Sequence, residues 1–84
     1  MKKYEEVILK LIYNEHKREG GLVDKDILER KFCSMDRKFN GELFDMGMDK
    51  LKQYGYIKFT MIQNDYINIE ITPSGIKYMQ NQNR

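Results

Sequence analysis

The carboxylates of this sequence include two close pairs whose spacing could support acid–base chemistry. Asp24 and Asp26 precede an apolar run, and Asp45 and Asp49 stand four residues apart within residues 41–54. Paired carboxylates exchange protons with a substrate when their surroundings keep one of them protonated. The first pair is better explained as the start of a helix, where a side-chain oxygen accepts backbone N–H bonds. The second is better explained as one solvated face of a helix, so neither pair indicates an acid–base site.

The sequence also lacks the groups of residues that usually support nucleophilic catalysis, metal binding or phosphate binding. The chain has one histidine, His16, and one cysteine, Cys33, which cannot build a thiolate or imidazole metal cluster within one chain. We expect His16 to be solvated, because no nucleophile is spaced to reach it, and Cys33 to be a half-buried residue near a helix end. Gly20-Gly21 has neither the glycine spacing nor the lysine of a phosphate-binding loop. We therefore expect a protein that is not an enzyme and that uses no cofactor, metal or small-molecule substrate.

Length and composition predict one small domain spanning residues 1–84. Hydrophobic residues make up 40% of the 84 and charged residues 33%, which is an ordinary globular balance. The formal net charge of +2 is compatible with DNA binding but does not argue for it. No apolar run approaches the roughly 20 residues of a membrane span. Glu5, Glu6 and Lys10 also interrupt the apolar stretch that a signal peptide would need. We expect a cytoplasmic protein with no membrane partner.

Apolar periodicity predicts two helices in the first half of the chain. The first covers residues 2–18 and ends at Gly20-Gly21, and Leu22-Val23 forms a short extended pair. Asp24 or Asp26 caps the second helix, residues 24–32. The side chains that this helix should turn inward are Ile27, Leu28 and Phe32. A polar connection follows over residues 34–40.

The second half should hold a third helix, a hairpin and a fourth helix. The third helix, residues 41–54, begins at the N-cap Asn40, ends at Gly55, and buries one side. That buried side consists of Phe44, Gly47, Met48 and Leu51. Residues 57–62 and 66–71 alternate as two strands joined by a tight turn at residues 63–65. In the second strand one face should hold Ile67, Ile69 and Ile71, and the other Tyr66, Asn68 and Glu70.

Thr72 and Pro73 mark the start of the fourth helix, residues 73–81, in the positions where helices favour an N-cap and tolerate proline. We expect Ile76 and Met79 to close the core, with Tyr78 at its flank, and residues 80–84 to fray. The resulting order is helix, short strand, helix, helix, β-hairpin wing and C-terminal helix. This order is typical of an α+β winged helix-turn-helix domain.

Two segments on either side of the hairpin resemble a known family. "LKQYGYI" at residues 51–57 and "IEITPSGIKYM" at residues 69–79 are similar to the YjcQ family of small winged-helix proteins from Gram-positive bacteria and their phages. Met79 stands where the family usually has leucine, a conservative change for a core position. The resemblance implies the winged-helix fold and a DNA-binding role. It covers residues 41–79 in sequence, and residues 1–40 only in the order of elements.

The helix that a winged helix inserts into DNA carries an acidic outer side in this sequence. Opposite the buried side lie Glu42, Met46, Asp49 and Gln53, with Asp45 and Lys52 on one flank and Leu43 and Lys50 on the other. The wing tip, residues 63–65, offers no lysine or arginine. The densest basic group is Arg30, Lys31, Arg37 and Lys38. These side chains could bind a phosphate backbone, and they are equally well explained as solvated surface residues.

Two hypotheses therefore stay open. The first, favoured by the resemblance, is a small phage-type DNA-binding regulator, with phosphate contacts from Arg37, Lys38, Lys50 and Lys52 and base contacts from Asn40 and Gln53. The second is a winged helix reused as a protein-interaction module, such as a phage-encoded inhibitor of a host nucleic-acid enzyme of the CRISPR type. Its basic partner would meet Glu42, Asp45, Met46 and Asp49. We also expect a homodimer through the first and last helices.

Overall fold

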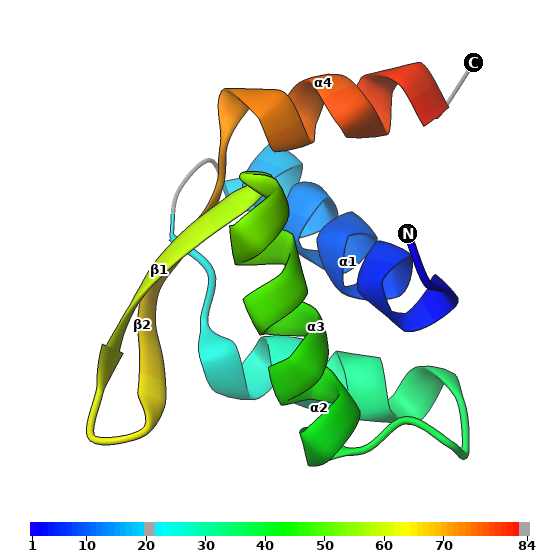
Figure 1. Ribbon diagram of the computed structural model, residues 1–84, viewed down its shortest axis with the longest axis vertical. Coiled ribbons are helices and arrows are strands. Elements are labelled where there is room, and N and C mark those ends of the chain that lie inside the picture. Colours follow the sequence, from blue (N-terminus) through cyan, green and yellow to red (C-terminus); the bar gives the residue numbers. More distant parts are fainter. Residues whose placement is uncertain (20–21, 83–84) are drawn as a thin grey trace.

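The computed structural model describes residues 1–19 and 22–82 and shows an α+β domain (Figure 1). Its elements are α1 (Lys3–Glu19), α2 (Lys25–Met35), α3 (Gly41–Tyr54), β1 (Ile57–Ile62), β2 (Asp65–Ile71) and α4 (Pro73–Gln82). The antiparallel hairpin lies along one side of α3, and α4 crosses the end of the molecule opposite α2 (Figure 1). The predicted order of elements is confirmed. The expected helix stop at Gly20-Gly21 lies outside the described residues.

The core forms where α1, α2 and α3 meet the hairpin. Phe44 of α3 lies at its centre, 5.8 Å from the ring of Phe32 and 5.9 Å from that of Tyr66. Phe39 stacks on Phe32 at 4.5 Å, so the connection before α3 contributes an aromatic ring that its polar composition did not predict. Phe44, Gly47, Met48 and Leu51 form the buried side of α3, as predicted.

Side-chain and glycine caps define the ends of α2 and α3. Asp24 accepts hydrogen bonds from the N–H groups of Asp26 and Ile27, and Asn40 accepts one from the N–H of Leu43. Gly55 ends α3 with φ 82°, in the left-handed region that glycine enters without strain. The predictions for Asn40 and Gly55 are confirmed, and of the two candidate caps of α2 the structure uses Asp24.

Two details of α2 differ from the prediction. The helix continues past Phe32 to Met35, so the connection to α3 is shorter than expected. Ile27 was expected to face inward but is 43% exposed, while Leu28 and Phe32 are buried. Successive residues of a helix are about 100° apart, and the side that buries Leu28 and Phe32 leaves Ile27 facing solvent.

The predicted facing of the second strand is wrong at Tyr66, because a β-bulge interrupts the hairpin. Thr60 pairs with Ile67 and Lys58 with Glu70, so Phe59 alone lies opposite two residues of β2. One of those two, Asn68, has φ 56°, a conformation that asparagine tolerates better than most residues. The extra residue reverses the alternation of side chains. Tyr66 therefore faces the core together with Ile69 and Ile71.

The turn and the short extended segment hold the hairpin in place. Gln63 and Asn64 have φ 52° and 64°, as a two-residue type I′ turn requires. On the other side of β2, the N–H of Val23 donates to the carbonyl of Ile69 at 2.9 Å. The extended pair predicted before α2 is thus a single β-bridge to β2.

The start of α4 is fixed by Thr72. Its hydroxyl accepts from the N–H of Gly75 at 3.1 Å and donates to the carbonyl of Gly55 at 2.6 Å, which joins the caps of α3 and α4. Met79 is buried, as predicted, whereas Ile76 is only half-buried and packs against the core. The helix extends to Gln82, so residues 80–82 are helical where fraying was expected.

An ion pair between Glu15 and Lys31 joins α1 to α2 and gives the fold a pH dependence. Its hydrogen bond from Lys31 is the main cause that lowers the pKa of Glu15 below its usual value. A depressed carboxylate pKa stabilises the fold above the unfolded value, about 4.3, and this contribution is lost as the pH falls through the folded pKa.

We therefore expect Lys31→Met to lower the free energy of unfolding by up to about 1 kcal/mol at neutral pH, since the pair is only partly shielded from solvent. The difference from the wild type should close as the pH falls below about 4.3. Urea titrations across this pH range measure it, with Lys10→Met, an exposed lysine of the same helix as Glu15, as the control. A pH-independent difference would contradict the assignment.

Candidate interaction face on α3 and the hairpin

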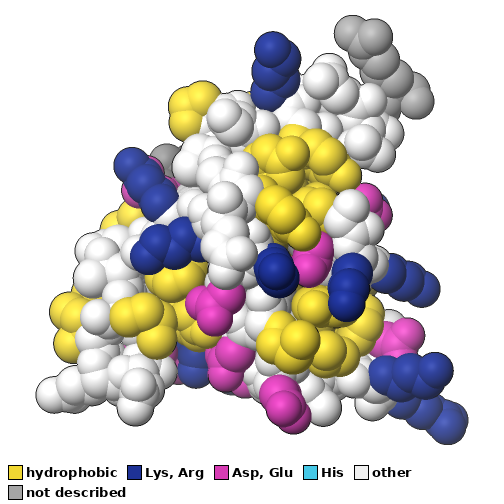
Figure 2. All heavy atoms as spheres, in the orientation of Figure 1, with side chains coloured by type: hydrophobic (Ala, Val, Ile, Leu, Met, Phe, Trp, Pro, Cys, Tyr) yellow, Lys and Arg dark blue, Asp and Glu magenta, His cyan; other side chains and the backbone are white. Residues whose placement is uncertain are grey.

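The outward side of α3 carries three exposed carboxylates, which we call the acidic stripe: Glu42, Asp45 and Asp49. Figure 2 shows acidic side chains following α3 down the face that lies beside the hairpin. Met46, on the same side, is 48% exposed. The structure therefore brings together the four residues predicted for a protein partner.

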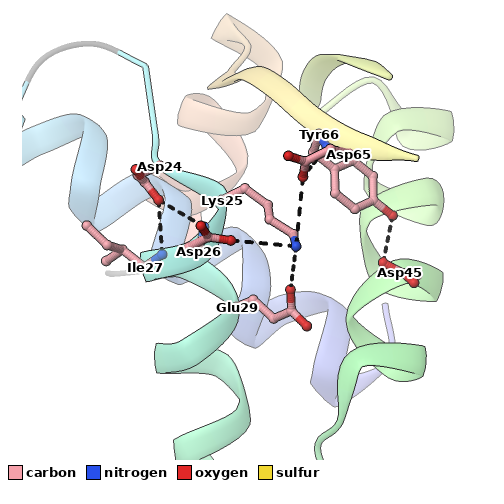
Figure 3. A network of polar contacts seen from close by, with 8 residues as sticks. All are labelled: Asp24, Lys25, Asp26, Ile27, Glu29, Asp45, Asp65 and Tyr66. Atoms are coloured by element: carbon pink, nitrogen blue, oxygen red, sulfur yellow. Dashed lines mark hydrogen bonds and ion pairs between the residues drawn. The ribbon is translucent and has the colours of Figure 1, made fainter. Parts of the chain in front are cut away.

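Asp45 is fixed by a contact that the sequence did not reveal. The Tyr66 hydroxyl of β2 donates to Asp45 Oδ1 at 2.9 Å (Figure 3). Burial, with the hydrogen bond to Asp45 and the nearby charges of Asp49 and Glu29, raises the pKa of the Tyr66 hydroxyl far above its usual value. Tyr66 thus stays a neutral donor, and it ties the hairpin to the acidic stripe.

Lys52, expected to contact phosphate, packs against the hairpin. Its Nζ lies 4.5 Å from the centroid of the Phe59 ring and 3.5 Å from the Phe59 carbonyl oxygen. These contacts hold the ammonium against β1. The three candidates on α3, Lys50, Lys52 and Gln53, are all exposed.

The remaining candidates for DNA contacts lie in the connection between α2 and α3. Arg37 and Lys38 are exposed there, and Figure 2 shows basic side chains gathered at this lower corner of the face. Asn40 uses its side-chain oxygen as the cap of α3. Lys31 is bound to Glu15, so the basic group expected at the end of α2 is reduced to Arg30, Arg37 and Lys38.

A second charged group, which sequence reasoning missed, lies between α2 and the hairpin. Lys25 Nζ lies 3.0 Å from Glu29, 3.7 Å from Asp26 and 3.8 Å from Asp65 (Figure 3). The hydrogen bond to Glu29 is the main cause that raises the pKa of Lys25. The four-residue spacing of Lys25 and Glu29 is a signal for part of this group, but nothing local points to Asp65.

Other candidate positions show no comparable arrangement. His16 and Cys33 are half-buried, and burial raises the pKa of the Cys33 thiol. Among the residues described, no group of His, Cys, Asp and Glu side chains is placed to hold a metal ion. None of the described helices is long and apolar enough to cross a membrane.

The surface expected to form a homodimer contains a contact within the chain. The Tyr78 hydroxyl of α4 donates to Glu6 of α1 at 3.1 Å, so the two helices bind each other. Pairing of this surface with a second copy stays a prediction. Comparison of the chain with protein-family models, with curated proteins and with solved structures finds no match.

Proposed function

We propose that the chain is a winged-helix domain of the YjcQ-like kind that binds a basic protein surface through α3 and the hairpin. The order of the elements and the placement of the hairpin beside α3 are compatible with this fold. In such a domain α3 and the wing form the face that meets a ligand. The partner is then a protein that is basic where it binds, such as the nucleic-acid groove of a host enzyme.

The observation that carries the proposal is the acidic stripe. DNA presents about one negative charge per 1.7 Å of its axis, so three exposed carboxylates on the contacting helix would oppose its approach. Asp45 is held at this face by Tyr66. The ammonium of Lys52, a basic side chain of α3, lies over the ring of Phe59. A basic protein surface is the complement of such a face.

DNA binding is the second candidate, and one observation favours it. Arg30, Arg37 and Lys38 are exposed at the end of α2 and in the connection that leads into α3. Residues at this place can grip a phosphate backbone. A regulator built in this way would use one edge of the face and would need a dimer to bury enough surface for specific binding.

A basic peptide tests the proposed face. A capped peptide of arginine and lysine should bind the wild type at low salt, and Glu42→Gln/Asp45→Asn/Asp49→Asn should weaken binding about tenfold or more, measured by fluorescence anisotropy. The asparagine at position 45 keeps an oxygen that can accept the bond from Tyr66. The matched control, Arg30→Gln/Arg37→Gln/Lys38→Gln, should bind at least as tightly as the wild type. Equal affinity of the wild type and the neutralised variant for the peptide would rule out the acidic stripe as the binding site.

A further inference from the structure

β1 is paired on one edge only. Within the described part of the chain its ladder partner is β2, and the other edge of β2 is bridged by Val23. Ile62 and Asp65 flank the two-residue turn as a directly opposed pair. Residues beside such a turn exchange both backbone hydrogen bonds, and the next residue along the strand, Met61, turns its N–H and C=O away from β2.

A contact of Lys52 independently supports the direction in which the backbone groups of Met61 point. Its Nζ, which comes from α3, approaches the carbonyl oxygen of Phe59 at 3.5 Å. Phe59 and Met61 are two residues apart in β1, so their carbonyls point to the same edge. The unpaired edge of β1 therefore lies on the side of α3, next to the acidic stripe.

The outer part of this edge has few of the features by which proteins usually protect an edge strand, since the β-bulge lies at its inner end, between Lys58 and Thr60. Residues 59–69 contain one charged residue, Asp65, and neither proline nor glycine. Lys52 covers the edge at Phe59, but Thr60, Met61 and Ile62 beyond it are exposed, Met61 by 48% and Ile62 by 52%. This part of β1 can accept another strand.

Building on the function proposed above, we infer that the basic partner binds as an extended segment that adds a strand to the free edge of β1. Its backbone pairs with Met61, and basic side chains on alternate residues reach the acidic stripe. This mode of recognition takes affinity from main-chain bonds and specificity from alternate side chains.

The spacing along the two elements agrees with this arrangement. Asp45 and Asp49 are separated by four helical residues, or about 6 Å along the axis of α3. Alternate residues of a strand are about 6.6 Å apart, so consecutive basic side chains match the two carboxylates. Apolar residues at the remaining positions of the segment would face the other side of the added strand, as Met61 and Ile62 face opposite sides of β1.

Backbone methylation of a peptide separates strand pairing from charge attraction. The probe is a capped peptide that alternates arginine and valine, prepared unmodified, with N-methyl groups on the valines, and with N-methyl groups on the arginines. All three carry the same charge. In a paired strand alternate N–H groups point to the neighbour, so one methylated peptide should lose at least about tenfold in affinity while the other binds much like the unmodified peptide.

The outcomes distinguish a failure of strand addition from a failure of the proposed binding at the acidic stripe. Equal binding of the two methylated peptides would overturn strand addition while leaving the acidic face as the binding site. An unmodified peptide that shows no binding at low salt, or that binds Glu42→Gln/Asp45→Asn/Asp49→Asn as well as the wild type, would contradict the proposed function itself.

A change in the protein gives the matching test. Met61→Pro removes the N–H at the free edge and leaves the ladder to β2 intact. It should therefore lower the affinity for the unmodified peptide about tenfold, whereas Met61→Val should leave this affinity unchanged. If Met61→Pro does not fold, amide hydrogen exchange on the wild type decides the matter. The peptide should slow exchange at the Met61 N–H about tenfold or more, and unchanged exchange in the saturated complex would overturn the inference.

Discussion

Phe44→Ala is expected to lower the free energy of unfolding by about 3–5 kcal/mol, the largest effect of any single substitution considered. The Phe44 side chain is fully buried and contacts the rings of Phe32 and Tyr66. Alanine leaves a cavity between α2, α3 and the hairpin that these elements cannot close without moving. Small domains have a free energy of unfolding of about 5–15 kcal/mol, so Phe44→Ala would remove much of the fold's stability.

Urea denaturation followed by circular dichroism measures this loss. Tyr66→Phe is the control, because it keeps the neighbouring ring and removes only the hydroxyl that binds Asp45. It should cost about 1 kcal/mol. A loss below about 1.5 kcal/mol for Phe44→Ala would mean that the core is not centred on this ring.

Gly75→Ala is expected to destabilise the fold by about 2 kcal/mol, although alanine is the better helix former. A Cβ at this position would lie 2.2 Å from the Tyr56 carbonyl oxygen and 2.7 Å from Ile71 Cγ1. The Tyr56 carbonyl cannot withdraw easily, because it accepts the N–H of Thr72 at 2.9 Å. The substitution must therefore push α4 away from the start of β1.

Gly47→Ala provides the matched control. A Cβ there would lie 2.4 Å from Ile8 Cδ1, the end of a flexible side chain that can adopt another rotamer. The gain in helix propensity, about 1 kcal/mol, offsets part of the cost, so the net change should stay below about 1 kcal/mol. If thermal unfolding shows both variants equally stable, the close approach of α4 to β1 is not what fixes Gly75.

Local signals in the sequence were sufficient to predict most of the fold. Asn40 and Thr72 cap helices through bonds to residues three positions ahead, and Gly55 ends α3 by its own backbone freedom. Such signals depend on a few neighbouring residues and can be read directly. The bounds predicted for α3 agree with the structure for the same reason.

The errors arise where the outcome depends on distant residues. The bulge that reverses Tyr66 lies within an alternating pattern that looks regular, because Asn68 is a suitable residue for an exposed strand face and for positive φ alike. Ile27 was placed inward by its apolar character, but the neighbours that decide its exposure lie on other elements.

The candidate face was predictable in part. The residues of the acidic stripe follow from helical spacing alone, since Glu42 and Asp49 lie opposite the side of Phe44 and Met48 and Asp45 lies on its flank. The bond of Asp45 to Tyr66 and the packing of Lys52 on Phe59 join α3 to the hairpin. No spacing within the sequence encodes these contacts, and they are what place the free edge of β1 beside the stripe.

The salt dependence of binding to random duplex DNA tests the central claim most directly, because a protein that grips phosphates must lose affinity steeply as salt rises. Fluorescence anisotropy with labelled duplex, at salt between about 50 mM and 200 mM, measures it. We predict no saturable binding by the wild type even at the lowest salt. Tight binding with a steep slope, abolished by Arg37→Ala/Lys38→Ala, would contradict the claim and assign this face to DNA.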